Sequence, residues 1–184
     1  MKINVSKISA ARSQLIEGIN LFFEERDPVS IHTLVGASLQ ILNDHITDIG
    51  DVYDNNLMLR YDSIYIIDKF RKLWITKINE ARNFFKHADQ DLKKGNNSIE
   101  FETNLNEFHI FEALRCLKIV EGEDHVFSIE FKIFTAWFCL KHHDLLKPEG
   151  KNFFLNIPYA EKFPVENLRE WMEMIRISKL QGII

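Results

Sequence analysis

The chain has 184 residues, 46% of them hydrophobic, so a single domain can bury a core here without disulfides or structural metals. Its 23 basic and 27 acidic side chains leave a formal net charge of −4, which excludes a protein that coats nucleic acid or a membrane surface through bulk positive charge. No apolar signal segment opens the chain and no stretch is apolar enough to span a membrane, so we expect a cytoplasmic protein without membrane association.

Apolar residues recur every three to four positions over long tracts, and only four prolines and seven glycines interrupt them, which predicts an all-α protein. The predicted helices cover residues of about 5–25, 28–46, 64–89, 105–120, 126–143 and 165–181. The segments between them are predicted to be loops or turns at about 47–63, 93–97 and 145–164, with a short extended connector at about 99–102. Asp27 is a good N-cap for the second helix, and Pro28 suits its first turn.

These elements predict one domain over residues 1–184, a bundle of about five to six helices. Its core would lie within about residues 5–143, followed by a C-terminal loop and a helical extension. The predicted core is rich in aromatic side chains, and we expect Trp74, Phe84, Phe85 and Trp137 to belong to it. The two cysteines, Cys116 and Cys139, lie in apolar helical patterns and are expected to be buried free thiols.

The common catalytic signatures are missing, including phosphate-binding glycine loops, Cys-x-x-Cys and His-Glu-x-x-His. The run His142-His143-Asp144 is a weak metal candidate, because neighbouring residues on a helix point about 100° apart. The other single histidines, at positions 45, 109 and 125, receive no role. We expect no metal and no cofactor.

The end of the third predicted helix carries a group of polar side chains on one side. At about 100° per residue, one side of this helix holds four polar side chains, and the other side holds small and aromatic ones. The polar side consists of Arg82, Asn83, Lys86 and His87, and the apolar side of Ala81, Phe84, Phe85 and Ala88. The polar side therefore combines a guanidinium that can bind a phosphate with an imidazole that exchanges protons near neutral pH.

The run from Arg82 to Ala88 resembles the R-x(4–6)-H motif of the HEPN superfamily, including the polar residue that commonly follows the arginine. HEPN domains are small all-α bundles, often dimeric, and many are metal-independent ribonucleases of defence and toxin–antitoxin systems, whereas others are not catalytic. The resemblance implies that Arg82 and His87 form the catalytic pair and that Asn83 supports them. It further implies RNA as substrate, a homodimer and an antitoxin protein as partner. Lys86 would be a second phosphate contact.

Three alternatives stay open at this point. A second match to the spacing runs from Arg26 to His32, although Asp27 and Pro28 are explained there by the start of a helix. The polar side could be an ordinary solvated face on which Arg82 and Lys86 pair with nearby acids such as Glu80 or Asp89. The same surface could also serve a non-catalytic binding module for a nucleotide or a protein, which the acidic net charge favours.

Overall fold

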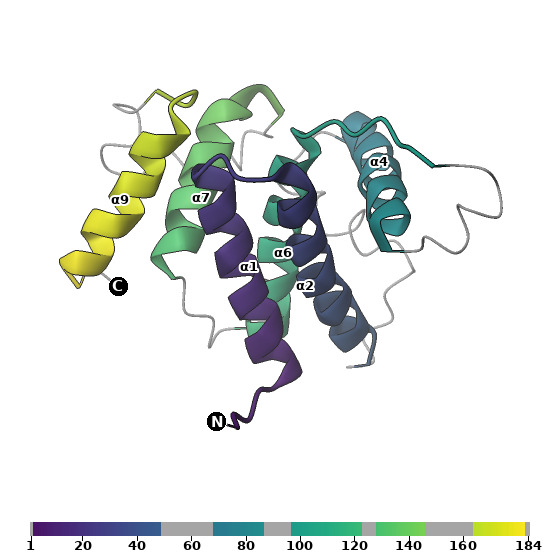
Figure 1. Ribbon diagram of the computed structural model, residues 1–184, viewed down its shortest axis with the longest axis horizontal. Coiled ribbons are helices and arrows are strands. Elements are labelled where there is room, and N and C mark those ends of the chain that lie inside the picture. The colour runs from purple at the N-terminus through teal and green to yellow at the C-terminus, as the bar shows by residue number, and fades with distance from the viewer. Residues whose placement is uncertain (1, 49–67, 87–96, 123–127, 146–163, 183–184) are drawn as a thin grey trace.

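The computed structural model describes residues 2–48, 68–86, 97–122, 128–145 and 164–182, and every regular element within these ranges is a helix (Figure 1). The elements are α1 (Lys7–Phe23), α2 (Pro28–Asp48), α4 (Asp68–Lys86), α6 (Leu105–Glu121), α7 (Ile129–Lys141), the short 3-10 helix η3 (His143–Leu145) and α9 (Leu168–Leu180). The predicted all-α helical bundle is therefore confirmed. Most of the predicted loops, and both ends of the helix expected at about 64–89, lie outside the described residues.

Local side-chain contacts explain how α1 and α2 begin. Ser6 caps α1, because its hydroxyl oxygen accepts a hydrogen bond from the backbone N–H of Ser9 at 3.0 Å. At the start of α2, Oδ2 of Asp27 accepts hydrogen bonds from the backbone N–H and the hydroxyl of Ser30, at 2.8 and 2.6 Å. The predicted start of this helix at Asp27 and Pro28 is confirmed.

The helices α1 and α2 form an antiparallel pair, and α6 packs behind them (Figure 1). A Cβ atom on Gly18 would lie only 2.7 Å from Cγ2 of Val35, so the absence of a side chain at Gly18 allows the two helices to approach closely. On one side of this pair lie α7 and α9, and on the other side lies α4 (Figure 1).

The core combines aliphatic side chains with a group of aromatic rings that come mainly from α1, α6 and α7. Trp137 and Phe134 are completely buried, and the ring of Phe111 stacks on that of Phe138 with centroids 4.1 Å apart. Cys116 and Cys139 are buried free thiols, as predicted. Among the described residues, no helix combines the length and the apolar character needed to cross a membrane.

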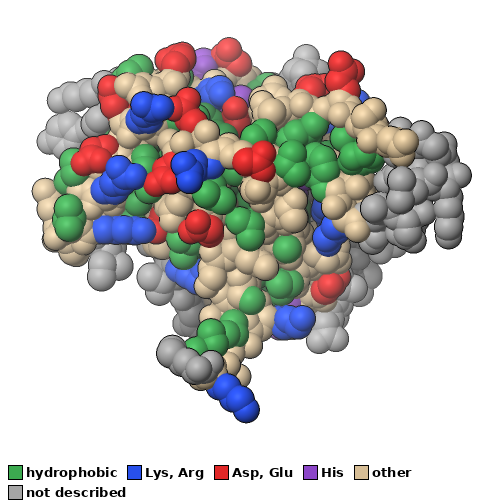
Figure 2. Space-filling view, in the orientation of Figure 1, with side chains coloured by type: hydrophobic (Ala, Val, Ile, Leu, Met, Phe, Trp, Pro, Cys, Tyr) green, Lys and Arg blue, Asp and Glu red, His purple; other side chains and the backbone are tan. Residues whose placement is uncertain are grey.

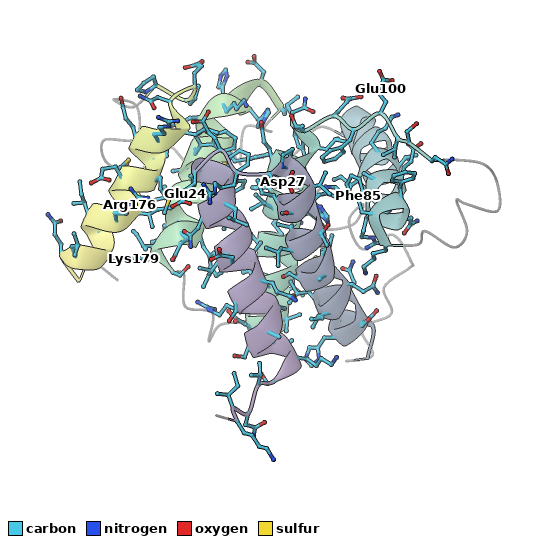
Figure 3. All side chains as sticks on the ribbon, in the orientation of Figure 1. Glu24, Asp27, Phe85, Glu100, Arg176 and Lys179 are labelled. Carbon is cyan, nitrogen blue, oxygen red and sulfur yellow. The ribbon has the colours of Figure 1, made fainter. Side chains whose placement is uncertain are left out.

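The prediction for α4 is wrong in one respect: Phe84 and Phe85 are only partly buried and do not belong to the core. The described residues of α4 that are buried are Ile78 and Ala81. Phe85 lies on the side of α4 that faces α2 (Figure 3), where its ring meets His32. The side chain of Trp74 lies outside the described part of the structure.

In Figure 2, the two sides of the molecule differ in the types of side chain at the surface. Acidic and basic side chains alternate over α1 and α9, whereas hydrophobic side chains gather between the upper ends of α2 and α4. The second region lies next to the polar groups of α4, α2 and α6 that are described below.

Candidate functional site

Arg82 lies on the packed side of α4 and not on its solvated side. Ile78, Ala81, Arg82 and Phe85 occupy one stripe of the helix, in which the first two are buried and the last two partly buried, while Asn83 and Lys86 are exposed. Arg82 is therefore less exposed than Asn83 and Lys86, with which the sequence pattern places it on one polar side. The physical reason is that Ile78 and Ala81 are buried where α4 packs against α2 and α6, which turns Arg82, one position after Ala81, toward those helices.

Gly36 in the middle of α2 provides the space for this arrangement. A Cβ atom at Gly36 would lie 3.2 Å from Cγ and 3.3 Å from Cδ of Arg82, and 3.3 Å from Cε1 of His109 on α6. Since these distances are tighter than ordinary Cβ contacts, glycine allows the stem of Arg82 and the ring of His109 to pack against the same point of α2.

Two histidines lie together next to Arg82, His32 on α2 and His109 on α6. Both are fully buried, and their Nδ1 atoms lie 3.3 Å apart. Nδ1 of His32 is 2.9 Å from Oδ1 of Asn106, and its Nε2 is 3.2 Å from the backbone carbonyl oxygen of Ile78 on α4. We call Arg82, His32, His109 and Asn106 the His–Arg cluster.

Two phenyl rings cover the part of the His32 ring that His109 does not contact. Phe85 of α4 and Phe101 of the segment before α6 meet the His32 ring edge-on, with centroids 5.7 and 5.1 Å away, and the two phenyl rings contact each other at 5.2 Å. These contacts exclude water from His32 and fix the orientation of its ring.

Burial and mutual repulsion oppose positive charge inside the His–Arg cluster. Burial lowers the pKa of His32, against hydrogen bonds to Asn106 and Ile78 that favour its charged form. The pKa of His109 lies well below 6.5, first because of burial and then because of the charges of His32 and Arg82. Burial also lowers the pKa of Arg82, and the negative charge of Asp44 opposes that shift.

The guanidinium of Arg82 makes no ion pair or hydrogen bond with any residue in the described ranges, although it is partly buried. The pairing with Glu80 that a solvated face would have used is absent, and Glu80 instead lies 3.6 Å from Lys77. A desolvated cation without a contacting anion is a favourable place for a phosphate oxygen to bind.

His87, the second residue of the predicted catalytic pair, lies outside the described residues. Asn83 and Lys86 are described and solvent-exposed, so both are available to a ligand that approaches α4. In the second spacing match, Arg26 is exposed in the turn before α2, whereas His32 is buried beside Arg82.

Sequence reasoning missed His109, which it treated as a single histidine without a partner, and it also missed Asn106 and Gly36. The available signal was a pair of polar residues three positions apart, Asn106 and His109, which share one side of α6 with apolar neighbours such as Ala113. Nothing in the sequence indicated that His32, 77 positions earlier, would lie against them.

The run His142-His143-Asp144 does not assemble a metal site. Nε2 of His142 lies 2.7 Å from Oε2 of Glu107, which also pairs with Lys141, while the exposed His143 pairs with Asp144 at 2.9 Å. Within the described ranges, no three histidine, cysteine or acidic side chains lie close enough together to hold a metal ion.

Comparisons of this chain with protein-family models, with curated proteins and with solved structures find no match.

Proposed function

We propose that this protein is a HEPN-like, metal-independent endoribonuclease that acts as a cytoplasmic homodimer in a defence or toxin–antitoxin system. The observation that carries the proposal is the guanidinium of Arg82, which is partly buried, has no anionic partner among the described residues and lies in the motif that resembles the HEPN signature. Its desolvation strengthens any interaction with a phosphate that enters. An antitoxin protein would be the partner that restrains the activity.

The proposed reaction uses the 2′-hydroxyl of RNA as an internal nucleophile, so that cleavage needs no metal ion. His87 accepts the proton of the 2′-OH, and the 2′ oxygen forms a bond to phosphorus. The bond from phosphorus to the 5′ oxygen of the next nucleotide breaks. That oxygen leaves with a proton donated by His87 of the second copy. Arg82 stabilises the negative charge on the phosphorane-like transition state. Asn83 orients the phosphate or the imidazole, and Lys86 is a further phosphate contact.

The test is cleavage of a mixed RNA by the purified protein in the presence of EDTA. Wild type is expected to cleave, and Arg82→Ala and His87→Ala are each expected to lose about 100-fold or more of the rate, because each removes a group that acts in the transition state. Lys77→Ala is the matched control, because Lys77 is an exposed cation of the same helix that pairs with Glu80. It should retain the wild-type rate.

Absence of cleavage by wild type would contradict the proposal. The alternative would then be a non-catalytic helical module that binds a nucleotide or a protein through the same surface. Equal cleavage by all four proteins would assign the activity to another part of the chain or to a contaminant.

A further inference from the structure

Each nitrogen of the His32 ring lies near an oxygen atom that can only accept hydrogen bonds. Its Nδ1 faces Oδ1 of Asn106 at 2.9 Å, and its Nε2 faces the carbonyl oxygen of Ile78 at 3.2 Å. The Asn106 amide cannot be reversed, because its Nδ2 donates to the carbonyl oxygen of Pro28 at 2.9 Å. Both nitrogens of His32 therefore face oxygen acceptors.

A neutral imidazole cannot donate to both of these oxygens, whereas an imidazolium can. Neutral His32 has one N–H group, so in either tautomer one ring nitrogen points its lone pair at an oxygen lone pair. Protonated His32 has two N–H groups, one for Asn106 and one for Ile78. The hydrogen-bonding geometry around His32 thus suits the charged form.

His109 can also adapt to a protonated His32. Its Nδ1 lies 3.3 Å from Nδ1 of His32 and can accept from that nitrogen, which leaves the hydrogen of His109 on Nε2. Nε2 of His109 is buried and has no hydrogen-bond partner, so that tautomer breaks no contact in the structure. One additional proton on His32 is accommodated without rearrangement of the neighbouring side chains.

The positive charge of Arg82 and the burial of His32 both oppose protonation of His32. The charged or titratable groups around the cluster are Asp44 on α2, Arg82 on α4, and His109 on α6 with Glu112 one turn further along. Asp44 acts on Arg82 without forming an ion pair, and Glu112 is paired with Arg115 at 3.0 Å. No described carboxylate contacts the His–Arg cluster. Among the described residues, a protonated His32 therefore has no negative charge beside it that would stabilise it.

We propose that the His–Arg cluster binds a phosphate-type oxyanion at the guanidinium of Arg82 and that His32 takes up one proton from solvent when the anion binds. The proton adds to the free lone pair of the His32 ring, and no bond of the anion changes. This inference rests on the proposed role of Arg82 as a phosphate contact, but not on RNA cleavage. The oxyanion is either a phosphodiester of RNA or a free ion.

The experiment is isothermal titration calorimetry of the full chain with two probes whose own charge is constant between about pH 5.5 and pH 8, inorganic sulfate and a short 2′-O-methyl oligoribonucleotide. The second probe presents phosphodiesters but has no free 2′-hydroxyl for cleavage. We expect the Kd to rise by up to about tenfold per pH unit between the pKa of His32 in the free protein and its higher pKa in the complex, as linkage to one proton requires. The measured binding enthalpy should vary linearly with the ionisation enthalpy of the buffer, with the slope that uptake of one proton per bound anion requires.

NMR observation of the His32 ring nitrogens gives a second, independent measurement on wild type. Saturation with sulfate near neutral pH should move both nitrogens to imidazolium shifts, and Arg82→Gln should remove the binding and the shift together. This measurement decides the question even where substitution of the buried His32 prevents folding.

The variant His32→Gln should bind the anion with a Kd that no longer depends on pH, whereas His45→Gln, a change at an exposed histidine of the same helix, should behave as wild type. Tighter binding of the oligonucleotide than of sulfate at equal ionic strength would identify RNA as the source of the oxyanion, and equal binding would identify a free ion.

The inference is overturned if neither probe binds, if the Kd is the same at every pH, or if His32 stays neutral in the saturated complex. Wild type that cleaves RNA but binds both probes independently of pH would contradict this inference alone. Proton-linked binding without RNA cleavage would contradict the proposed nuclease and leave this inference standing.

Discussion

At the scale of single residues, the buried His109 couples folding to pH. Burial and two neighbouring positive groups hold its pKa well below 6.5, whereas in the unfolded chain it titrates near that value. The pKa of His32 is lowered in the same direction. As the pH falls below about 6.5, the unfolded chain therefore binds protons that the folded chain does not, and stability that is fully present above that pH is lost.

We predict that the free energy of unfolding of wild type falls by up to about 1.4 kcal/mol per pH unit for each of these histidines as the pH drops below about 6.5. The measurement is urea denaturation over a pH series in a buffer without sulfate or phosphate, since an oxyanion would favour protonated His32. His109→Gln removes one titrating group and should show a shallower slope, while His45→Gln should keep the wild-type slope. Identical slopes for all three proteins would contradict this account of His109.

At the scale of secondary-structure elements, α9 is attached to the bundle in two ways. Trp171 is completely buried, and its indole N–H donates to the carbonyl oxygen of Pro164 at 3.2 Å. Figure 3 labels the two side chains of a surface ion pair between α9 and α1, in which Arg176 lies 3.0 Å from Glu24. Because Arg176 keeps 55% of its side-chain surface exposed, solvent screens most of that attraction.

We predict that Trp171→Ala lowers the free energy of unfolding by about 3 to 5 kcal/mol, because it leaves a large cavity among α1, α7 and α9. Arg176→Ala should lower it by less than about 1 kcal/mol, as is usual for an exposed ion pair. Urea denaturation of both variants and wild type measures the two effects. A similar loss in both would show that surface charge, and not burial of the indole, holds α9 in place.

At the scale of the whole molecule, α4 flanks the α1–α2 pair on the side opposite α7 and α9 (Figure 1), with Asn83 and Lys86 exposed on it. One copy supplies a single Arg–His pair beside the exposed Asn83 and Lys86, whereas two such faces brought together double the cationic groups and exclude solvent from them. The proposed nuclease therefore requires a two-fold symmetric dimer in which the α4 helices meet.

We predict that wild type sediments as a dimer and that Arg82→Ala and His87→Ala remain folded and dimeric, although both lose cleavage. Analytical ultracentrifugation over a concentration series measures the assembly, and circular dichroism checks the helical content of each variant. A monomer that cleaves RNA would contradict the dimeric site, and a monomer that does not cleave would favour the binding module.

The sequence by itself determined the helical class, the approximate position of each described helix, the start of α2 at Asp27 and Pro28, and the burial of Trp137 and both cysteines. These features depend on local capping and on hydrophobic periodicity, which a linear sequence contains in full. The same periodicity could not determine how deeply Phe84 and Phe85 are buried, because that depends on which elements pack over the end of α4.

Only the tertiary structure decided where Arg82 points and which groups surround it. That outcome depends on Gly36, which leaves room on α2, and on His109, which reaches the same place from α6. The contact between the two imidazoles joins residues 77 positions apart, so no spacing rule within one helix could identify it. A site assembled from three helices exists only once their packing has fixed the distance and rotation of each helix relative to the others.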